Sequence, residues 1–271
     1  MKRIIDNIWL CLFGFVVVAT TLFLLAPLLM VLVMSFDGRS FVGRFPPPSL
    51  SLQWYAKFFS DDYFLDGLWT SITLGLSTAA AATVLGTGAA LFLDRTRFRG
   101  RHFLIALFLS PLIVPHIVLG FGLLVLLRHA GLDNVFLSLL IGHVVVTIPY
   151  AIRIVLTSLQ GLKANLVEAA MALGATEYRA IWDVVLPLSR TGVVAASVVA
   201  LAVSMDEVTM SVFLIDPFTY TLSTALFATM RDSFNLVIAA ASVLLMGITC
   251  MAVLLLDRLV GLDRIAGQGD R

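Results

Sequence analysis

Long runs of apolar residues dominate the chain and predict its architecture. Six of them cover roughly 8–34, 67–93, 102–127, 135–159, 188–215 and 234–256. Each is long enough to cross a bilayer, which takes about 20 apolar residues in a helix. In lipid every backbone N–H and C=O needs a partner within the protein, so runs of this length should be helices. The pattern predicts an all-α membrane protein, with six transmembrane helices in a single domain over 1–271.

Composition supports a membrane environment. Hydrophobic residues make up 60% of the 271 residues, charged residues only 13%, and the mean hydropathy is +1.01. So little charge cannot coat a water-facing surface, and so much apolar content excludes disorder. The net charge of +1 gives no indication of nucleic-acid binding. Cys11 and Cys250 both lie in apolar runs and imply no disulfide framework.

The positive charges predict the orientation. With the N-terminus inside, thirteen of the 18 lysines and arginines lie on the inner side, at positions 2, 3, 95, 97, 99, 101, 153, 163, 179, 190, 258, 264 and 271. The excess favours both termini in the cytoplasm. The first run lacks a convincing cleavage site, so it is interpreted as a retained span rather than a signal peptide.

The first outer loop, about 35–66, contains an amphipathic segment. Pro46, Pro47 and Pro48 exclude a helix at that point. The segment 51–59 that follows carries Leu52, Trp54, Tyr55, Phe58 and Phe59. Two interpretations are open: a helix lying at the membrane interface, or a loop packed on other helices.

The longest inner segment, about 160–187, is predicted to form an elbow of two helices. Asn165 is a candidate N-cap, with Glu168 as its capping-box partner. Leu166, Ala169, Ala170 and Leu173 form a narrow apolar face of small side chains. Gly174 can end the first helix with φ > 0, Thr176 begins the second, and Pro187 comes at the start of the fifth span. Such an elbow suits either a groove in a partner protein or a partner-free interfacial position.

The same segment resembles the signature loop of ABC-importer permease subunits. That signature is Glu-Ala-Ala, three residues, Gly, nine residues, an aliphatic residue, one residue and Leu-Pro. It is matched here by Glu168, Ala169, Ala170, Gly174, Val184, Leu186 and Pro187. Val184 stands where isoleucine is more usual. The resemblance implies the ABC type I importer permease fold, with the loop acting as the coupling helix that seats in the ATP-hydrolysing subunit.

Other segments resemble the spermidine/putrescine (PotC-like) type of this family. They are Ser35, Phe36 and Asp37 with the outer-loop prolines and aromatics, the inner loop at 95–101, and Leu201–Phe213 with its Ser-Met-Asp-Glu core at 204–207. One departure is Leu112, since related permeases can carry an acidic residue there. The departure weakens polyamine as the specific solute without affecting the family.

The resemblance also implies partners and a location. The partners expected are a dimer of ATP-binding subunits, a second and unlike permease subunit, a periplasmic solute-binding protein and the lipid bilayer of a bacterial inner membrane. The chain has no phosphate-binding loop, so ATP and Mg belong to the partner ATPase. This chain is expected to bind no cofactor, to have no catalytic residues and to work by alternating access.

Asp206 and Glu207 are the acids placed well inside a predicted span. A lipid-facing charge there costs about 2.5–3.5 kcal/mol, so both are expected to face the bundle interior. They either line the path of a cationic solute or are satisfied structurally by neighbouring helices. Adjacent helical residues point about 100° apart, so both need not face one cavity.

Span three supplies a second candidate wall of the path. Pro111 and Pro115 should break its backbone ladder beside His116. Tyr150, next to Pro149 in span four, offers a ring that can stack on a cation. Each also has a purely structural interpretation, a packing kink or a packed aromatic.

Several motifs carry no chemistry. His102, His116, His129 and His143 are not at metal-ligand spacing, so no metal site is predicted. Gly86 and Gly88 are interpreted as small packing residues between helices.

Two other classes of protein remain as alternatives to the importer permease. One is a secondary carrier driven by an ion gradient, which would favour inverted repeats that are not visible. The other is a membrane enzyme, which would need a catalytic cluster that is not apparent. The sequence does not identify the solute: polyamines lead, followed by other small amines, amino-acid-like solutes and aminophosphonates.

Overall fold

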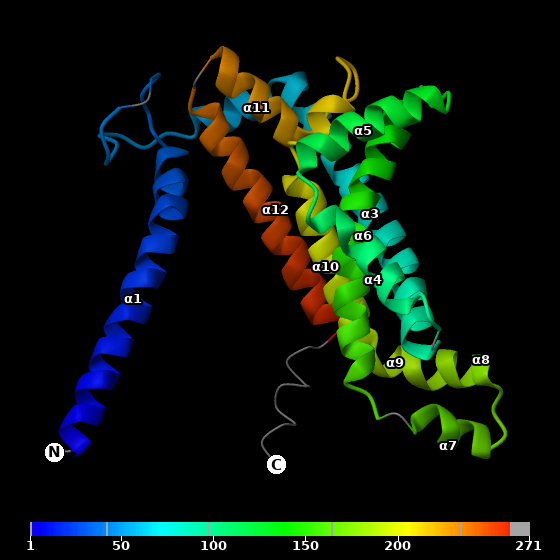
Figure 1. Ribbon diagram of the computed structural model, residues 1–271. Coiled ribbons are helices and arrows are strands. Elements are labelled where there is room, and N and C mark those ends of the chain that lie inside the picture. Colours follow the sequence, from blue (N-terminus) through cyan, green and yellow to red (C-terminus); the bar gives the residue numbers. More distant parts are fainter. Residues whose placement is uncertain (1, 42, 97, 164, 234, 261–271) are drawn as a thin grey trace. The chain divides into compact units, whose positions relative to one another are not determined.

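The regular secondary structure of the described residues is almost entirely helical. The computed structural model describes residues 2–41, 43–96, 98–163, 165–233 and 235–260, with one isolated antiparallel bridge between Asp37 and Leu50 (Figure 1). The chain divides into two compact units. One combines the chain up to Asp62 with Ala228–Met246, and the other combines Tyr63–Phe227 with the chain from Gly247 on.

The first unit contains the first predicted span and the outer loop. Its helices are α1 (Lys2–Met34) and α2 (Gln53–Phe59). Most described side chains of α1 are apolar and exposed, as expected of a helix whose solvent is lipid. In α2, Trp54 and Phe58 are buried while Phe59 is exposed. The helix therefore has both a packed side and an uncovered apolar side.

The second unit holds most of the remaining helices. They are α3 (Asp62–Arg95), α4 (Arg101–Leu109), η1 (Ser110–Leu112), α5 (His116–His129), α6 (Val135–Gln160), α7 (Leu166–Ala172), α8 (Glu177–Ala180), η2 (Ile181–Val185), α9 (Leu186–Leu188), α10 (Arg190–Asp206) and η3 (Ser211–Phe213). Two further helices, α11 (Leu222–Asp232) and α12 (Val237–Val260), contribute to both units.

The helices account for six candidate spans by length and composition. Four pass alone: Trp9–Met34 within α1, α3, α6 and Val237–Leu255 within α12. Two bent pairs bring the number to six if each pair is one span. The all-helical membrane fold predicted from the apolar runs is thus what the structure shows.

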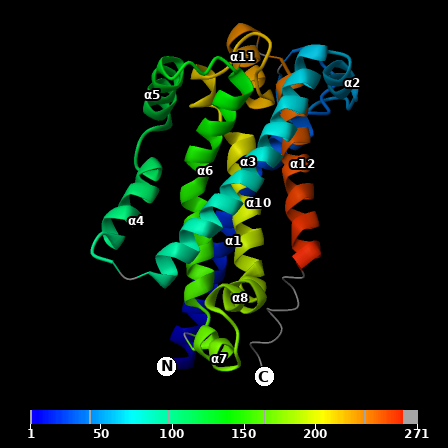
Figure 2. The same cartoon turned by 90° about the vertical axis from the view of Figure 1, so that its right-hand side faces the viewer.

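The helix of the third span is interrupted at Pro111 and Pro115, as their positions in the sequence predicted. Arg101–Leu112 and His116–His129 meet at an angle of 102° (Figure 2). Pro111 lies in the short η1 turn, and Pro115 precedes α5 with extended backbone angles, φ −55° and ψ 131°. Proline donates no backbone hydrogen bond and its ring excludes the preceding helical turn. The break makes His116 the first residue of a new helix.

The fifth span is shorter than its apolar run. The sequence predicts a helix to about 215, but α10 ends at Asp206 and Glu207 has extended angles, φ −73° and ψ 108°. The residues that follow remain apolar, which is why hydropathy alone did not find the end. Asp206 and Glu207 therefore lie at a helix terminus rather than in mid-helix.

Close helix packing forms the core of the second unit. One buried cluster joins α3, α6, the elbow and α10 through Ala90, Ala151, Val155, Leu159, Val167, Ala180, Val185 and Ala196. A second joins α3 and α6 to the segment after α10 through Leu74, Leu139, Val146, Met210 and Leu214. Four of the eight residues of the first cluster are alanine, as expected where membrane helices approach closely.

Gly86 and Gly88 differ in how closely a neighbouring helix approaches their backbone. A Cβ atom at Gly86 would lie 2.6 Å from the Cβ of Ala151, so the α3–α6 approach requires glycine there. A Cβ atom at Gly88 would meet nothing within 4 Å. The packing interpretation is therefore confirmed for Gly86, and it is wrong for Gly88 within this chain, because Gly88 points away from α6 and is exposed.

This difference predicts opposite effects of the same substitution on one helix. Gly86→Ala should destabilise the protein by about 1–3 kcal/mol, because a methyl group is forced against α6. Gly88→Ala, its matched control, should leave stability unchanged or raise it, because alanine favours helix. Thermal unfolding of the two purified variants in the same detergent measures this. Equal midpoints for both variants would show that α3 and α6 do not meet at Gly86.

Candidate functional site

The segment between α6 and α10 forms the predicted elbow, at the end of α6 away from α5 (Figure 1). Its first helix, α7, ends in a Schellman motif. The Ala175 N–H donates to the Ala170 carbonyl at 3.1 Å, and the Gly174 N–H donates to the Met171 carbonyl at 2.9 Å. Gly174 has φ of +93°, which other residues rarely adopt. The prediction that Gly174 ends this helix with φ > 0 is confirmed.

The two caps of the elbow differ from each other. Thr176 precedes α8 with extended angles, and its hydroxyl accepts from the Arg179 N–H at 3.4 Å, so the predicted restart of the helix is confirmed. Asn165 holds the N-cap position of α7, but its side chain makes no cap hydrogen bond. Its angles, φ −85° and ψ 0°, are not the extended ones that side-chain capping uses. The predicted capping box with Glu168 is therefore wrong.

The second arm of the elbow is irregular before it joins α10. After α8 the chain makes a π-helical turn, η2, in which the Leu186 N–H donates to the Ile181 carbonyl. Pro187 follows, and the chain then bends by 66° into α10. Because Pro187 has no N–H to donate, the regular α-helical ladder cannot run through this point. Pro187 thus lies in the last turn of the elbow, just before the bend.

The inner side of the elbow is part of the protein core. Val167 of α7, Ala180 of α8 and Val185 of η2 are buried in the cluster that also contains Ala90 of α3 and Ala196 of α10. The elbow is therefore packed onto three spans by apolar contacts. A displacement of the elbow must be transmitted to these helices or must break that packing.

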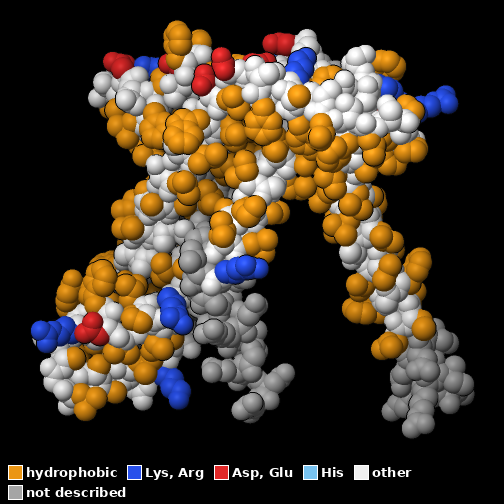
Figure 3. All heavy atoms as spheres, turned by 180° about the vertical axis from the view of Figure 1, so that it is seen from behind, with side chains coloured by type: hydrophobic (Ala, Val, Ile, Leu, Met, Phe, Trp, Pro, Cys, Tyr) orange, Lys and Arg blue, Asp and Glu red, His pale blue; other side chains and the backbone are white. Residues whose placement is uncertain are grey.

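The outer side of the elbow exposes apolar side chains. The residues are Met171, Leu173, Tyr178, Trp182 and Leu188, with Leu173 91% exposed. Tyr178 and Trp182 lie one turn apart with ring centroids 5.9 Å from each other. Figure 3 shows hydrophobic side chains gathered on the elbow, at the lower left, with basic side chains among them. Exposed apolar patches of this kind mark contact surfaces.

The predicted apolar face of α7 is not the face that packs. Leu166 and Ala170 are half-buried, whereas Ala169 and Leu173 are exposed. Val167, which the prediction left out, is the most buried residue of the helix, with 6% of its surface exposed. α7 packs through Val167 against the rest of the elbow and the ends of the spans. The predicted face, interpreted as a surface for a partner's groove or for the membrane interface, remains partly exposed. Glu168 lies on the exposed side.

Glu207 joins the two interrupted spans. Its carboxylate lies 2.7 Å from Nδ1 of His116, the first residue of α5 after the break. The other carboxylate oxygen accepts from the Met210 N–H at 2.8 Å. Glu207 is buried, with 7% of its surface exposed. Two of the predicted path residues, His116 and Glu207, are thus in direct contact.

Asp206 and Tyr150 lie apart from that pair. Asp206 is exposed at the last position of α10, so the two adjacent acids do point into different environments. Tyr150 is half-buried on α6, beside buried Pro149. Within the described residues, Tyr150 makes no hydrogen bond with Asp206, Glu207 or His116. The four candidate path residues therefore do not form one cluster.

The sequence interpretation missed a second buried polar network around His143. Its Nδ1 lies 2.8 Å from the Ser204 hydroxyl, and its Nε2 lies 2.9 Å from the Ser211 hydroxyl. The Ser211 hydroxyl also lies 2.9 Å from the Glu207 carbonyl. A neutral imidazole has one donor and one acceptor nitrogen, so both hydroxyls can be satisfied. The available signal was a histidine within an apolar run and serines on both sides of the acid pair.

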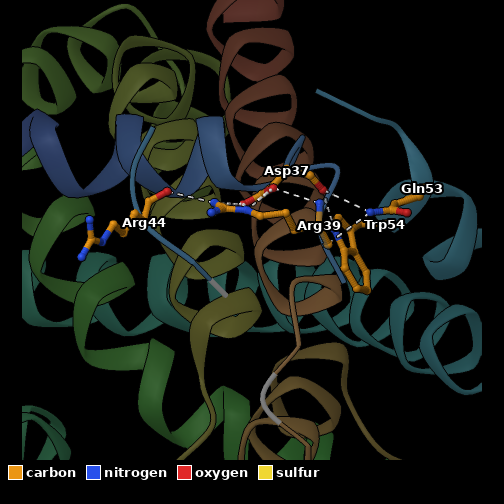
Figure 4. A network of polar contacts seen from close by, with 5 residues as sticks. All are labelled: Asp37, Arg39, Arg44, Gln53 and Trp54. Carbon is orange, nitrogen blue, oxygen red and sulfur yellow. Dashed lines mark hydrogen bonds and ion pairs between the residues drawn. The ribbon is translucent and has the colours of Figure 1, made fainter. Parts of the chain in front are cut away.

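The outer loop is organised by Asp37 (Figure 4). Its buried carboxylate accepts from Arg39, whose hydrogen bonds hold the pKa of Asp37 below its ordinary value. The Asp37 carbonyl accepts from the Trp54 indole at 2.8 Å and from the Gln53 amide at 3.3 Å. Arg39 also donates to the Arg44 carbonyl at 2.9 Å. These contacts tie the loop after α1 to α2.

Comparison with known proteins gives a family for the larger part of the chain. Residues 82–261 match the family described as "Binding-protein-dependent transport system inner membrane component". This region contains the elbow, Glu207, His116 and His143. Among curated relatives, the spermidine/putrescine transport system permease protein PotC of Shigella flexneri is 28% identical over 247 residues, 91% of this chain and 92% of PotC.

A second relative and a solved structure agree with that family. The putrescine transport system permease protein PotI of Escherichia coli is 31% identical, covering 83% of this chain and 82% of PotI. A chain of the bacterial alginate ABC transporter, solved with a periplasmic protein bound to an alginate pentasaccharide, matches with a TM-score of 0.73. It is 17% identical and covers 96% of both chains, so it shows the fold alone.

The family decides between the classes of protein that the sequence left open. Its members are inner-membrane components of binding-protein-dependent transport systems, not carriers driven by an ion gradient, and they are non-catalytic transport subunits. The predicted ABC type I importer permease fold is confirmed. The chain therefore belongs to the family of binding-protein-dependent transport system inner membrane components, as a multi-pass permease of an ABC importer.

Proposed function

We propose that this chain forms half of the translocation path of an importer for a small cationic solute, with polyamines as the leading candidates. The other half is a second and unlike permease subunit. PotC and PotI, whose names state spermidine/putrescine and putrescine transport, support this solute class. The fold does not support it, because the alginate transporter has the same fold and carries an acidic polysaccharide.

The main support for an importer mechanism is the exposed outer side of the elbow. An apolar surface is uncovered there, while the opposite side of the same elbow is packed onto α3, α6 and α10. A partner that binds the outer side therefore acts directly on the spans. We assign this surface to the dimer of ATP-binding subunits, with Glu168, Ala169, Ala170, Gly174, Leu186 and Pro187 as the coupling residues.

The transport cycle follows from that attachment. A periplasmic binding protein delivers the solute to the outer loops, including the loop that Asp37 organises. ATP closes the ATPase dimer, the elbow moves with it, and the spans open outward; hydrolysis returns them inward. ATP and Mg are bound by the partner, and this chain contributes no cofactor site to the cycle.

Asp206 is the group best suited to attract a cation. It is exposed, whereas Glu207 is already engaged by His116 and the Met210 N–H. Tyr150 and His116 are secondary candidates for the path, and Tyr150 is suited to stack on a cationic solute.

The orientation predicts which side chemical labels reach. Both termini and the segment 160–187 should face the cytoplasm. A single cysteine at position 177, in a background without Cys11 and Cys250, should stay unlabelled when intact cells meet an impermeant thiol reagent. It should label after the cells are opened, which is the control. The equivalent test at position 97 lies outside the described residues. Labelling of position 177 in intact cells would contradict the proposed topology.

The coupling role predicts the effect of a side chain at Gly174. Gly174→Val should strain the turn by about 1–3 kcal/mol, because φ of +93° is unfavourable for a β-branched residue. We expect loss of solute-stimulated ATP hydrolysis in reconstituted vesicles while the complex still assembles. Gly161→Val is the matched control, because Gly161 has an ordinary φ of −74°. Normal stimulation in the Gly174 variant would remove the elbow from the coupling mechanism.

The cation site predicts a loss of uptake at Asp206. Asp206→Asn keeps size and hydrogen bonding but removes the charge, so polyamine uptake per purified complex should fall roughly tenfold. Glu207→Gln should instead lower the unfolding temperature, because it weakens the contact with His116. Uptake and thermal unfolding are measured for both variants. Normal uptake with Asp206→Asn would rule out this carboxylate as a solute contact.

A further inference from the structure

His143 of α6 is a buried titratable side chain that has no part in the transport cycle described so far. Its side chain is fully enclosed by the protein. It lies between two serines on either side of the interruption that follows α10. Ser204 belongs to the last turn of that helix, and Ser211 is the first residue of η3. The imidazole thus bridges the interruption.

The hydrogen bonds around His143 run in one direction. The Ser211 hydroxyl donates to the Glu207 carbonyl at 2.9 Å, so its oxygen is left to accept from the imidazole Nε2–H. None of the ion pairs among the described residues includes His143, and a buried cation without a counter-ion is unfavourable. The ring is therefore neutral, and its Nδ1 accepts from the Ser204 hydroxyl. With this tautomer, each of the three protons has an acceptor.

Neighbouring helices hold the same segment from other sides. A Cβ atom at Gly142 of α6 would lie 2.9 Å from the Met210 side chain, so α6 lies directly against the interruption. Ser223 of α11 donates to the Met205 carbonyl at 2.7 Å. These residues all belong to the second unit. The backbone before and after Asp206 is thus fixed by buried contacts.

Asp206 combines this fixed backbone with an exposed side chain. It is the last residue of α10, one position after the carbonyl that Ser223 engages and two positions after Ser204. A charged group that is already held in place binds an ion with a smaller loss of conformational entropy than a mobile one. The contacts of His143 therefore affect the carboxylate that the proposed function assigns to the solute.

We propose that His143 is a positioning residue for Asp206. By holding Ser204 and Ser211 at a fixed separation, the neutral imidazole keeps the last turn of α10 intact and sets the direction of the Asp206 carboxylate. His143 is buried, so it acts on the solute only through that carboxylate. Its effect on uptake rests on the proposed function, whereas its effect on the geometry of the segment does not.

A purely structural role for His143 predicts a different pattern of results. A structural histidine would lower the stability of the whole fold, and its effect on uptake would add to that of Asp206→Asn. A positioning residue acts through Asp206, so its effect on uptake should disappear once the Asp206 charge is removed. The two roles are therefore separated by combining the two substitutions.

Spin-label mobility at position 206 tests the geometry without any solute. Asp206→Cys is introduced in a background without Cys11 and Cys250, and the attached nitroxide is measured by electron paramagnetic resonance in the assembled complex. His143→Leu should mobilise the label, because the Ser204 hydroxyl loses the acceptor that ties it to α6. The fold should survive this change, since that hydroxyl can bond back to its own helix.

Three further variants sharpen this measurement. His143→Gln should restore part of the immobilisation, because an amide again offers a donor and an acceptor. Ser204→Ala, which leaves the ring in place, should mobilise the label to a smaller extent than His143→Leu. His129→Leu is the matched control and should change nothing, because His129 is exposed on α5 and its Nδ1 lies 3.1 Å from the Val125 carbonyl of its own helix.

Putrescine uptake per purified complex tests the consequence for transport. His143→Leu should reduce uptake about fivefold, the factor expected for one neutral hydrogen bond. In the Asp206→Asn background, the same change should cause no further reduction. The unfolding temperature should fall by the same amount in both backgrounds, because it reports the stability of the fold rather than the solute contact.

Two results would overturn the proposal. An immobile label in the His143→Leu complex would show that the imidazole does not position residue 206. Additive losses of uptake for His143→Leu and Asp206→Asn would show that His143 acts on transport by another route. Normal uptake with Asp206→Asn would instead contradict the proposed cation site, and the label mobility would then decide the positioning role alone.

Discussion

A chain that stops being helical inside a membrane must still satisfy its backbone groups, and here that constraint falls on Glu207. α10 ends one residue before it, and its carboxylate accepts the Met210 N–H that the lost helical turn leaves without a partner. The same carboxylate contacts His116, where the third span restarts after its own break. The Glu207 carboxylate thus accepts hydrogen bonds from residues at both interruptions. A carboxylate that would be unfavourable in the middle of a membrane helix therefore stabilises the backbone where α10 ends.

The surrounding contacts extend this arrangement to the neighbouring helices. His143 of α6 bonds Ser204 before the break and Ser211 after it. Ser223 of α11 donates to the Met205 carbonyl at 2.7 Å, one of the carbonyls that a helix end leaves unpaired. α10 then runs for about 25 Å, at 1.5 Å per residue, from this network to the elbow. One rigid helix therefore connects the surface assigned to the ATPase with the point where both spans are interrupted.

Local rules predicted several features of the fold that depend on local chemistry, although the capping box of Asn165 and Glu168, also a local prediction, is absent. Gly174 ended α7, Thr176 began α8, and Pro111 and Pro115 broke the third span, each where its own backbone requirements predicted. The end of α10 was not predictable in this way, because Val208, Met210 and Val212 continue the apolar pattern beyond it. What permits that end is the contact of Glu207 with a histidine 91 positions earlier in the chain.

In the elbow, too, some features follow from the local sequence and others only from contacts with distant residues. Its position followed from the sequence, but the buried face of α7 did not, because that face depends on which side meets the spans. Val167 packs inward, while Leu173, which the spacing placed on the apolar face available to a partner or to the membrane interface, is 91% exposed. An apolar residue in a contact surface for a partner has the same sequence pattern as a core residue, so periodicity alone cannot separate the two.

The two adjacent acids have different environments, and this limits what each can do in transport. Glu207 is buried and already has two partners, so a solute that bound it would compete with His116 for the carboxylate. Asp206 carries no such cost, because it is exposed at the helix end. A change in the angle between the broken third span and α10 would, however, separate His116 from Glu207. The exposed acid is thus suited to solute attraction, and the buried one is suited to holding the two spans in one of their arrangements.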